Sequence, residues 1–170
     1  MNFKRLLLAL PLLFSSRQNR DETDENSPYF VVPVGSRLVL HQTVTVPAFA
    51  AAVHLQGGLW TPQIEISRYN PHCKFELRQP KDVPQTIAPD EFVVTRTTEE
   101  VMVQNETTQI RSRVLMLQSK RQPQVSRLSC TVWQSIVDGR PVSGRELRQA
   151  LGQAFTLEIA GRAAASRPRP

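Results

Sequence analysis

Two cysteines, each within a stretch of alternating apolar and polar residues, constrain this chain more than any other feature. Cys73 shares the apolar side of its stretch with Phe75 and Leu77, and Cys130 shares that of its own stretch with Val132. Successive side chains of a β-strand point to opposite faces. We therefore expect two strands, each directing a sulfur into the core.

A disulfide between Cys73 and Cys130 is the interpretation that we favour, because paired cysteines in an exported chain usually form one. A nucleophilic Cys73 would need an exposed sulfur with a lowered thiol pKa, whereas the alternation places it inside. A structural zinc site needs about four ligands. The chain offers only two isolated cysteines and three scattered histidines, so we assign no metal.

The first sixteen residues have the organisation of a secretory signal. Lys4 and Arg5 precede nine apolar residues from Leu6 to Phe14, whereas a membrane-spanning helix needs about 20. We predict a signal peptide at 1–16 and an exported product, periplasmic or secreted. No later segment has the apolar length of a transmembrane helix, so we expect a soluble product after processing. An N-terminal core helix is the alternative, but polar residues follow the run at once.

The charge of the chain is concentrated at its ends. The formal net charge is +6, but without Lys4, Arg5, Arg162, Arg167 and Arg169 the chain keeps 16 basic residues against 15 acidic ones. Nucleic-acid binding depends on clustered Lys and Arg that neutralise phosphates. We therefore expect no nucleic-acid partner.

A chain of 170 residues suits one ordinary domain. Residues 17–28 are polar, with no apolar periodicity, and predict a flexible leader. We expect residues 29–160 to form a single β-rich domain and residues 161–170 to be a disordered basic tail.

Period-two alternation and turn residues predict about seven or eight short strands. We place them at 37–46, 48–56, 63–69, 73–78, 91–104, 110–119, 128–137 and 154–160. The first two would form a hairpin, although the alanines of 48–54 also allow a helix. Residues 79–91 contain several prolines and are expected to be a long exposed loop.

One helix is predicted near the C-terminus, at about 143–151. Ser143 and Glu146 have the spacing of a capping box, and Gly152 suits the residue after a helix. The pattern favours a mainly β fold, either a small antiparallel β-sandwich or an open barrel, with this one short helix.

The sequence contains none of the catalytic or phosphate-binding motifs that we sought, such as G-x-S-x-G, H-E-x-x-H or a P-loop. We therefore assign no catalytic residues and no cofactor. Trp60 and Trp133 are candidate contact residues, unless they form a second core layer. His41 and His54 would be neighbours on the outer face of the first hairpin, and we include them as candidate binding residues.

These features favour a non-enzymatic, exported β-domain that binds a protein or another component of the cell envelope, as an accessory protein. A carrier of a small ligand, with its pocket inside a barrel, is the main alternative. A hydrolase whose site is assembled across strands, for instance from His41 with Glu65 or Asp90, ranks last.

Overall fold

A computed structural model describes residues 22 and 24–161, of which most lie in β-strands and the turns that join them. The predicted signal peptide at 1–16 and nearly all of the predicted tail lie outside the described residues. The elements are β1 (Arg37–Leu40), β2 (Val44–Val46), β3 (Ala52–Gln56), β4 (Leu59–Trp60), the 3-10 helix η1 (Gln63–Glu65), β5 (His72–Leu77), β6 (Gln85–Ile87), β7 (Asp90–Val103), β8 (Thr108–Gln118), β9 (Val125–Ser135), α2 (Gly144–Leu151) and β10 (Phe155–Glu158).

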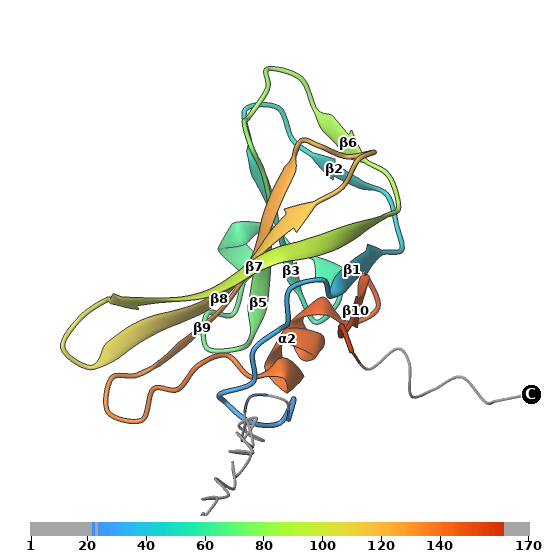
Figure 1. The fold of residues 1–170 in the computed structure, drawn as a ribbon. Coiled ribbons are helices and arrows are strands. Elements are labelled where there is room, and N and C mark those ends of the chain that lie inside the picture. Colours follow the sequence, from blue (N-terminus) through green and yellow to red (C-terminus); the bar gives the residue numbers. More distant parts are fainter. Residues whose placement is uncertain (1–21, 23, 162–170) are drawn as a thin grey trace, which may run out of the picture.

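Eight of the strands form one antiparallel sheet that curls into a half-barrel (Figure 1). Their order is β10-β1-β7-β8-β9-β5-β3-β4. A second sheet contains β2 and β6. It continues the pairing of β1 with β7 beyond the bends that separate β1 from β2 and β6 from β7. The structure thus confirms a mainly β fold with one short helix near the C-terminus, and it takes the open-barrel form.

The concave side of the sheet holds the core. Alternate residues of the strands are buried there, among them Leu38, Phe75, Phe92 and Leu128. These side chains come from four different strands, so the alternation seen in the sequence does place one face of each strand in a shared interior.

The helix α2 covers the open side of the half-barrel, where the sheet does not close on itself (Figure 1). Leu147, Ala150 and Leu151 are buried on its inner face. At its end, the amide of Gly58 in the β3–β4 turn donates to the carbonyl of Ala150 at 3.0 Å. The helix therefore joins the two edges of the sheet, contacting β3 and β10.

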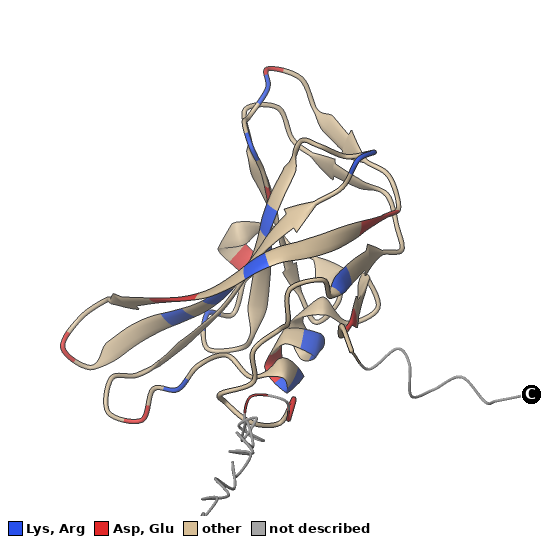
Figure 2. Cartoon of the chain, viewed as in Figure 1, with Lys and Arg blue, Asp and Glu red and all other residues tan. Residues whose placement is uncertain are grey.

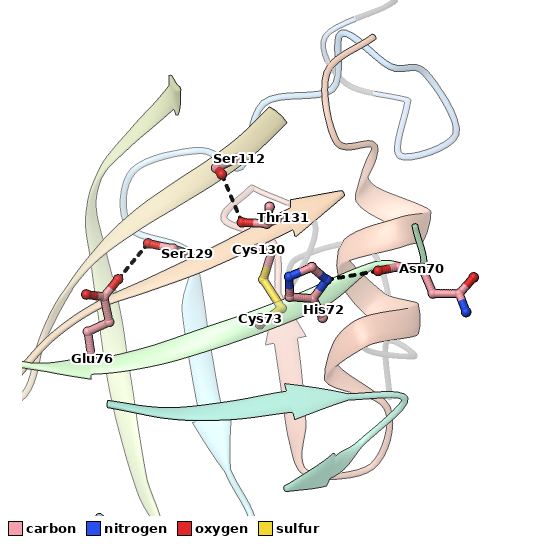
Figure 3. Close-up of a disulfide and its surroundings, with 8 residues drawn as sticks. All are labelled: Asn70, His72, Cys73, Glu76, Ser112, Ser129, Cys130 and Thr131. Atoms are coloured by element: carbon pink, nitrogen blue, oxygen red, sulfur yellow. Dashed lines mark hydrogen bonds between the residues drawn. A yellow bond between two sulfur atoms is a disulfide. The ribbon is translucent and has the colours of Figure 1, made fainter. Parts of the chain in front are cut away.

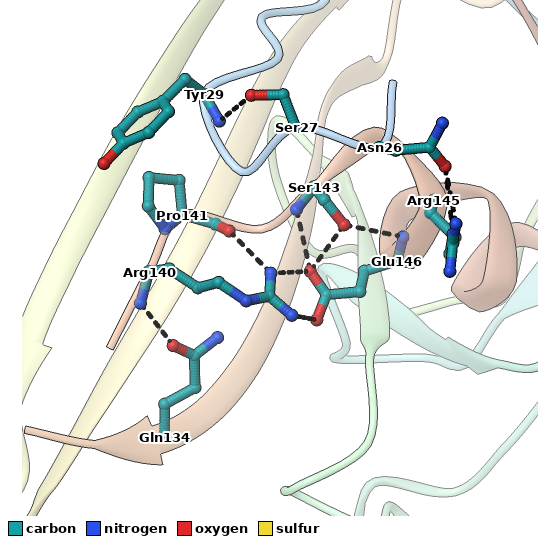
Figure 4. Close-up of polar contacts among 9 residues, drawn as sticks. All are labelled: Asn26, Ser27, Tyr29, Gln134, Arg140, Pro141, Ser143, Arg145 and Glu146. Atoms are coloured by element: carbon teal, nitrogen blue, oxygen red, sulfur yellow. Dashed lines mark hydrogen bonds and ion pairs between the residues drawn. The ribbon is translucent and has the colours of Figure 1, made fainter. Parts of the chain in front are cut away.

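The predicted capping box is present at the start of α2 (Figure 4). The amide of Glu146 donates to Oγ of Ser143 at 3.3 Å, and the amide of Ser143 donates to the Glu146 carboxylate at 2.9 Å. Burial would raise the pKa of Glu146, but Arg140 and Ser143 hold it below its ordinary value. The cap thus supplies acceptors for otherwise unsatisfied amides of the first turn.

Part of the predicted leader, residues 24–28, has defined contacts with α2. The Arg148 guanidinium lies 2.5 Å from the Glu25 carboxylate, and the amide of Arg145 donates to the Glu25 carbonyl at 3.0 Å. Asn26 accepts a hydrogen bond from the Arg145 side chain at 2.8 Å. The contacts of the domain therefore extend upstream of Tyr29.

The cysteine prediction is confirmed. Strands β5 and β9 pair so that Cys73 lies directly opposite Cys130, with their Cα atoms 4.0 Å apart and a disulfide between the sulfurs (Figure 3). Both residues are buried among core side chains. The crosslink thus joins two neighbouring strands at the centre of the sheet.

The predicted hairpin between 37–46 and 48–56 is wrong. The first segment is divided: β1 pairs with β7 and β10, and β2 pairs with β6. Residues 52–56 do form a strand, β3, but it pairs with β4 and β5. Alternation specifies which face of a strand is buried, and it does not specify the neighbouring strand.

The strand predicted at 63–69 is also absent. These residues form η1 and turns, and Ile64 is 93% exposed despite its place in the alternating pattern. Its neighbour in the chain, β4, has only two residues and offers no ladder to extend. The loop predicted at 79–91 contains the short strand β6, whose Ile87 is buried.

We predict that Gly152→Ala destabilises the protein more than Gly57→Ala does. Both glycines have positive φ, 49° and 58°, where a side chain costs about 1–2 kcal/mol. A Cβ on Gly152 would lie 2.6 Å from Cα of Gly58, whereas nothing lies within 4 Å of one on Gly57. Urea unfolding should show an additional loss of about 1 kcal/mol or more for Gly152→Ala; equal losses would contradict the close approach.

We predict that replacing Cys73 and Cys130 together by alanine lowers the free energy of unfolding by roughly 4 kcal/mol. The disulfide links residues 57 positions apart, and a crosslink of this span restricts the unfolded chain by about that much. Chemical unfolding of the double variant and of the oxidised protein gives the comparison. A difference below about 1 kcal/mol would mean that β5 and β9 do not depend on the crosslink.

Candidate functional site

A surface hollow of about 390 Å³ lies at the open edge of the half-barrel, between β2 and the β3–β4 hairpin. Strand β4 pairs with only the last two residues of β3, so the rest of β3 borders this hollow. Its lining is mixed, with apolar, hydroxyl, amide and imidazole groups: Thr45, Pro47, Ala52, Val53, His54, Trp60, Thr61, Pro62 and Gln63.

Trp60 links the hollow to the core. Its ring packs edge-on against Phe155, with 5.9 Å between centroids, and is tilted against Phe75 at 6.4 Å. Its buried Nε1 has no hydrogen-bond partner among the described residues. Trp60 therefore fits both interpretations made from the sequence. It packs at the edge of the core, and it also lines a surface hollow where it could contact a partner.

His54 contributes the titratable side chain of the hollow. It lies on β3 opposite Lys74 of β5. Burial lowers the pKa of His54, and the positive charges of Lys74 and His72 lower it further. The imidazole is consequently neutral near pH 7, and it presents a hydrogen-bonding group without a charge.

The other two candidates lie elsewhere. His41 is exposed in the bend after β1, with Nε2 2.7 Å from Oγ1 of Thr156, so the predicted pairing of His41 with His54 is wrong. Trp133 is half-buried, with the Tyr69 ring 6.3 Å and the Arg68 guanidinium 4.9 Å away. The structure therefore brings together Trp60 and His54, and it places His41 and Trp133 apart from them.

The other walls of the hollow were not predicted from the sequence. Thr45 and Pro47 come from the β2 segment, and Pro62 and Gln63 from the start of η1. No motif connects these residues. They meet only because β2 leaves the large sheet to pair with β6.

A polar network on the outer face beside the disulfide was also missed (Figure 3). Burial would raise the pKa of the Glu76 carboxyl, but hydrogen bonds from Arg127, Ser129 and Lys74 hold it below its ordinary value. Arg127 Nε lies 3.0 Å from Glu76. All of these groups are satisfied by one another, so we interpret the network as a structural link between β5 and β9.

A buried arginine lies on the concave face of β8. Arg113 is 3% exposed and donates to the carbonyl of Phe30, while its Nε has no partner among the described residues. Burial lowers the pKa of its guanidinium. The arginine fastens the segment before β1 to the sheet.

The described part of the chain offers no metal cluster and no membrane-spanning helix. No group of three or more His, Cys, Asp or Glu side chains is arranged there to hold a metal ion. No helix in that part is long and apolar enough to cross a bilayer.

Comparisons with protein-family models, with curated proteins and with solved structures found no match.

We predict that acidification from pH 7.5 to 5.5 lowers the free energy of unfolding through His54 and His72. Burial lowers the pKa of both imidazoles, so the unfolded chain binds protons more readily and stability falls as the pH drops through their ordinary value near 6.5. Unfolding curves measured at several pH values give the free energy of unfolding at each pH. This free energy should change less with pH in the variant with both histidines replaced by glutamine. An unchanged dependence on pH in that double variant would contradict the prediction.

Proposed function

We propose that this chain is an exported, non-enzymatic binding domain, an accessory protein of the cell envelope that contacts its partner through the hollow beside β3. The observation that carries the proposal is the convergence of Trp60 and His54 on that hollow. An indole fixed by core packing, with proline, hydroxyl and amide groups beside it, is a typical composition for a contact site. The aromatic ring offers apolar surface that a partner can bury, and the polar groups orient the partner through hydrogen bonds.

The chemistry of the hollow favours binding over catalysis. His54 is the one titratable residue in its lining, whereas an active site usually combines a base with a nucleophile and with groups that stabilise the developing charge. Among the described residues, no hydrogen bond or ion pair joins the pairs considered for a hydrolase. His41 Nε2 lies 2.7 Å from Thr156 Oγ1, and Asp90 accepts from Ser119 at 2.5 Å.

The packing of the half-barrel disfavours a carrier with an internal pocket. Side chains of the sheet and of α2 occupy the concave side, whereas an internal ligand would need a cavity of several hundred Å³ there. The hollow beside β3 lies outside this core. A protein segment or a surface polymer reaches it without opening the domain.

The disulfide supports the proposed location. A buried crosslink between Cys73 and Cys130 forms and persists in oxidising compartments, which agrees with the apolar N-terminal run of the sequence. Charges of both signs are spread over the described elements (Figure 2), whereas nucleic-acid binders gather their basic residues on one face.

We predict that Thr45→Lys weakens the binding of the domain to cell envelopes at least tenfold. Thr45 is an exposed strand residue on the wall of the hollow, so the longer, charged side chain occupies the hollow and leaves the core intact. Purified domain should bind envelopes of the producing cells saturably, as measured by sedimentation of the envelopes and quantification of the bound fraction.

Thr95→Lys is the matched control, because Thr95 is an exposed strand residue on β7, away from the hollow. It introduces the same charge and should retain the original affinity. Absence of saturable binding by the unmodified domain would contradict the proposed function. Equal weakening of envelope binding by the two lysine variants would mean that the hollow is not the binding site.

A further inference from the structure

The far half of β7 has an unpaired edge. Strand β7 pairs with β1 from Asp90 to Val93, and Val94 continues this contact through the backbone of Ser36. From Thr98 to Val103, β7 has β8 on one side and no strand of the described chain on the other. Figure 1 shows this part of β7 and β8 extending away from the body of the domain as an arm.

The backbone groups on this edge are identified by the turn of the β7–β8 hairpin. The amide of Gln104 donates to the carbonyl of Thr108 at 2.9 Å, so residues 104 and 108 are a hydrogen-bonded pair. Such pairs alternate with non-hydrogen-bonded pairs along an antiparallel ladder. The N–H and C=O groups of Val103 and Val101 therefore point away from β8, as do those of Glu99.

The side chains along the end of this edge are apolar and exposed. The exposed fractions are 51% for Val101, 63% for Met102 and 62% for Val103. Unpaired, apolar strand edges template pairing with another chain, and proteins normally shorten or cover them. The other edges of this sheet are managed in that way: β4 has two residues, and Arg148 of α2 donates to the Leu157 carbonyl of β10 at 2.9 Å.

We propose that this edge binds a second copy of the chain, with the two β7 strands antiparallel and related by a two-fold axis at Met102. In this register Val101 of each copy faces Val103 of the other. Both valines direct their backbone groups outward, so they form the hydrogen-bonded pairs. The two Met102 side chains meet at the axis in the non-hydrogen-bonded position, where side chains lie closest.

The self-complementary pattern around Met102 is the reason for choosing a second copy as the occupant. A two-fold interface brings the same patch of both copies together, and here each apolar residue faces an apolar one while Glu100 faces Gln104. An axis at Val101 would place Glu99 opposite Val103, and an axis at Glu100 would place two carboxylates opposite each other. Directly opposed like charges destabilise a ladder.

This interface is short, and it is separate from the hollow. Pairing of Val101, Met102 and Val103 buries less surface than a stable interface normally needs, so the dimer should depend on protein concentration. In the large sheet, β8, β9 and β5 lie between β7 and β3. The proposed dimer contact and the proposed binding site therefore lie on different parts of the sheet, and neither depends on the other.

A cysteine scan tests both the contact and its register. The two native cysteines are joined in the buried disulfide, so an introduced cysteine supplies the reactive thiol. Met102→Cys should form a covalent dimer under mild oxidation, because opposite residues at a non-hydrogen-bonded position have Cβ atoms about 4.5–5.5 Å apart, near the range a disulfide needs. Non-reducing electrophoresis over time gives the rate.

The controls separate pairing from random collision. Glu100→Cys faces Gln104 of the other copy and should react at least tenfold more slowly, as should Val137→Cys, at a position 84% exposed outside the β7 edge. Equal rates at the three positions would overturn the pairing. A faster reaction at Val101→Cys than at Met102→Cys would overturn the register.

Sedimentation equilibrium provides a measurement without an added thiol. The unmodified domain should dimerise with rising concentration, and Val103→Pro should weaken this at least tenfold, because proline removes one outward N–H that the ladder with β8 does not use. Circular dichroism checks that the variant folds. A domain that stays monomeric at all concentrations would overturn the proposal. If Val103→Pro then still weakened the binding of that monomer to envelopes, the β7 edge would be a contact surface for a different protein.

Discussion

The pairing of β5 with β9 is the interaction on which the rest of the structure depends. These strands lie inside the sheet order, and they are joined by ladder hydrogen bonds, by the buried disulfide and, on the outer face, by the Glu76–Arg127 ion pair. The β7–β8 hairpin is added to one side of them and the β3–β4 hairpin to the other. Strand β3 pairs with β5 and strand β8 pairs with β9, so both hairpins are attached to the crosslinked pair.

A half-barrel leaves strand edges that a closed barrel would not have. The edges of this half-barrel differ in what lies against them. The helix α2 covers the gap between β10 and β3–β4, with glycines at the point of closest backbone approach. The edge of β3 beyond β4 borders the hollow that holds His54 and Trp60. The end of β7 is the edge that no described element covers. The two surfaces to which we assign binding are thus consequences of incomplete closure.

Much of this fold was predictable from local patterns. Alternation identified the buried faces of the strands that carry Cys73 and Cys130, and the capping box located the start of α2 at Ser143. These features were predictable because they depend on residues a few positions apart. The strand at 63–69 failed for the opposite reason: Ile64 fits the pattern, but no neighbouring strand is available to pair with it.

By itself, the sequence determined which faces are apolar, which cysteines can bond and where the helix near the C-terminus begins, since spacing along the chain encodes all three. Only the tertiary structure decided which strands are neighbours. That decision separated His41 from His54, brought Thr45 beside Trp60, and left Val101–Val103 without a partner strand. The physical reason is that ladder partners are chosen by the closure of the whole sheet around its core, and a period of two residues is the same whichever strand lies alongside.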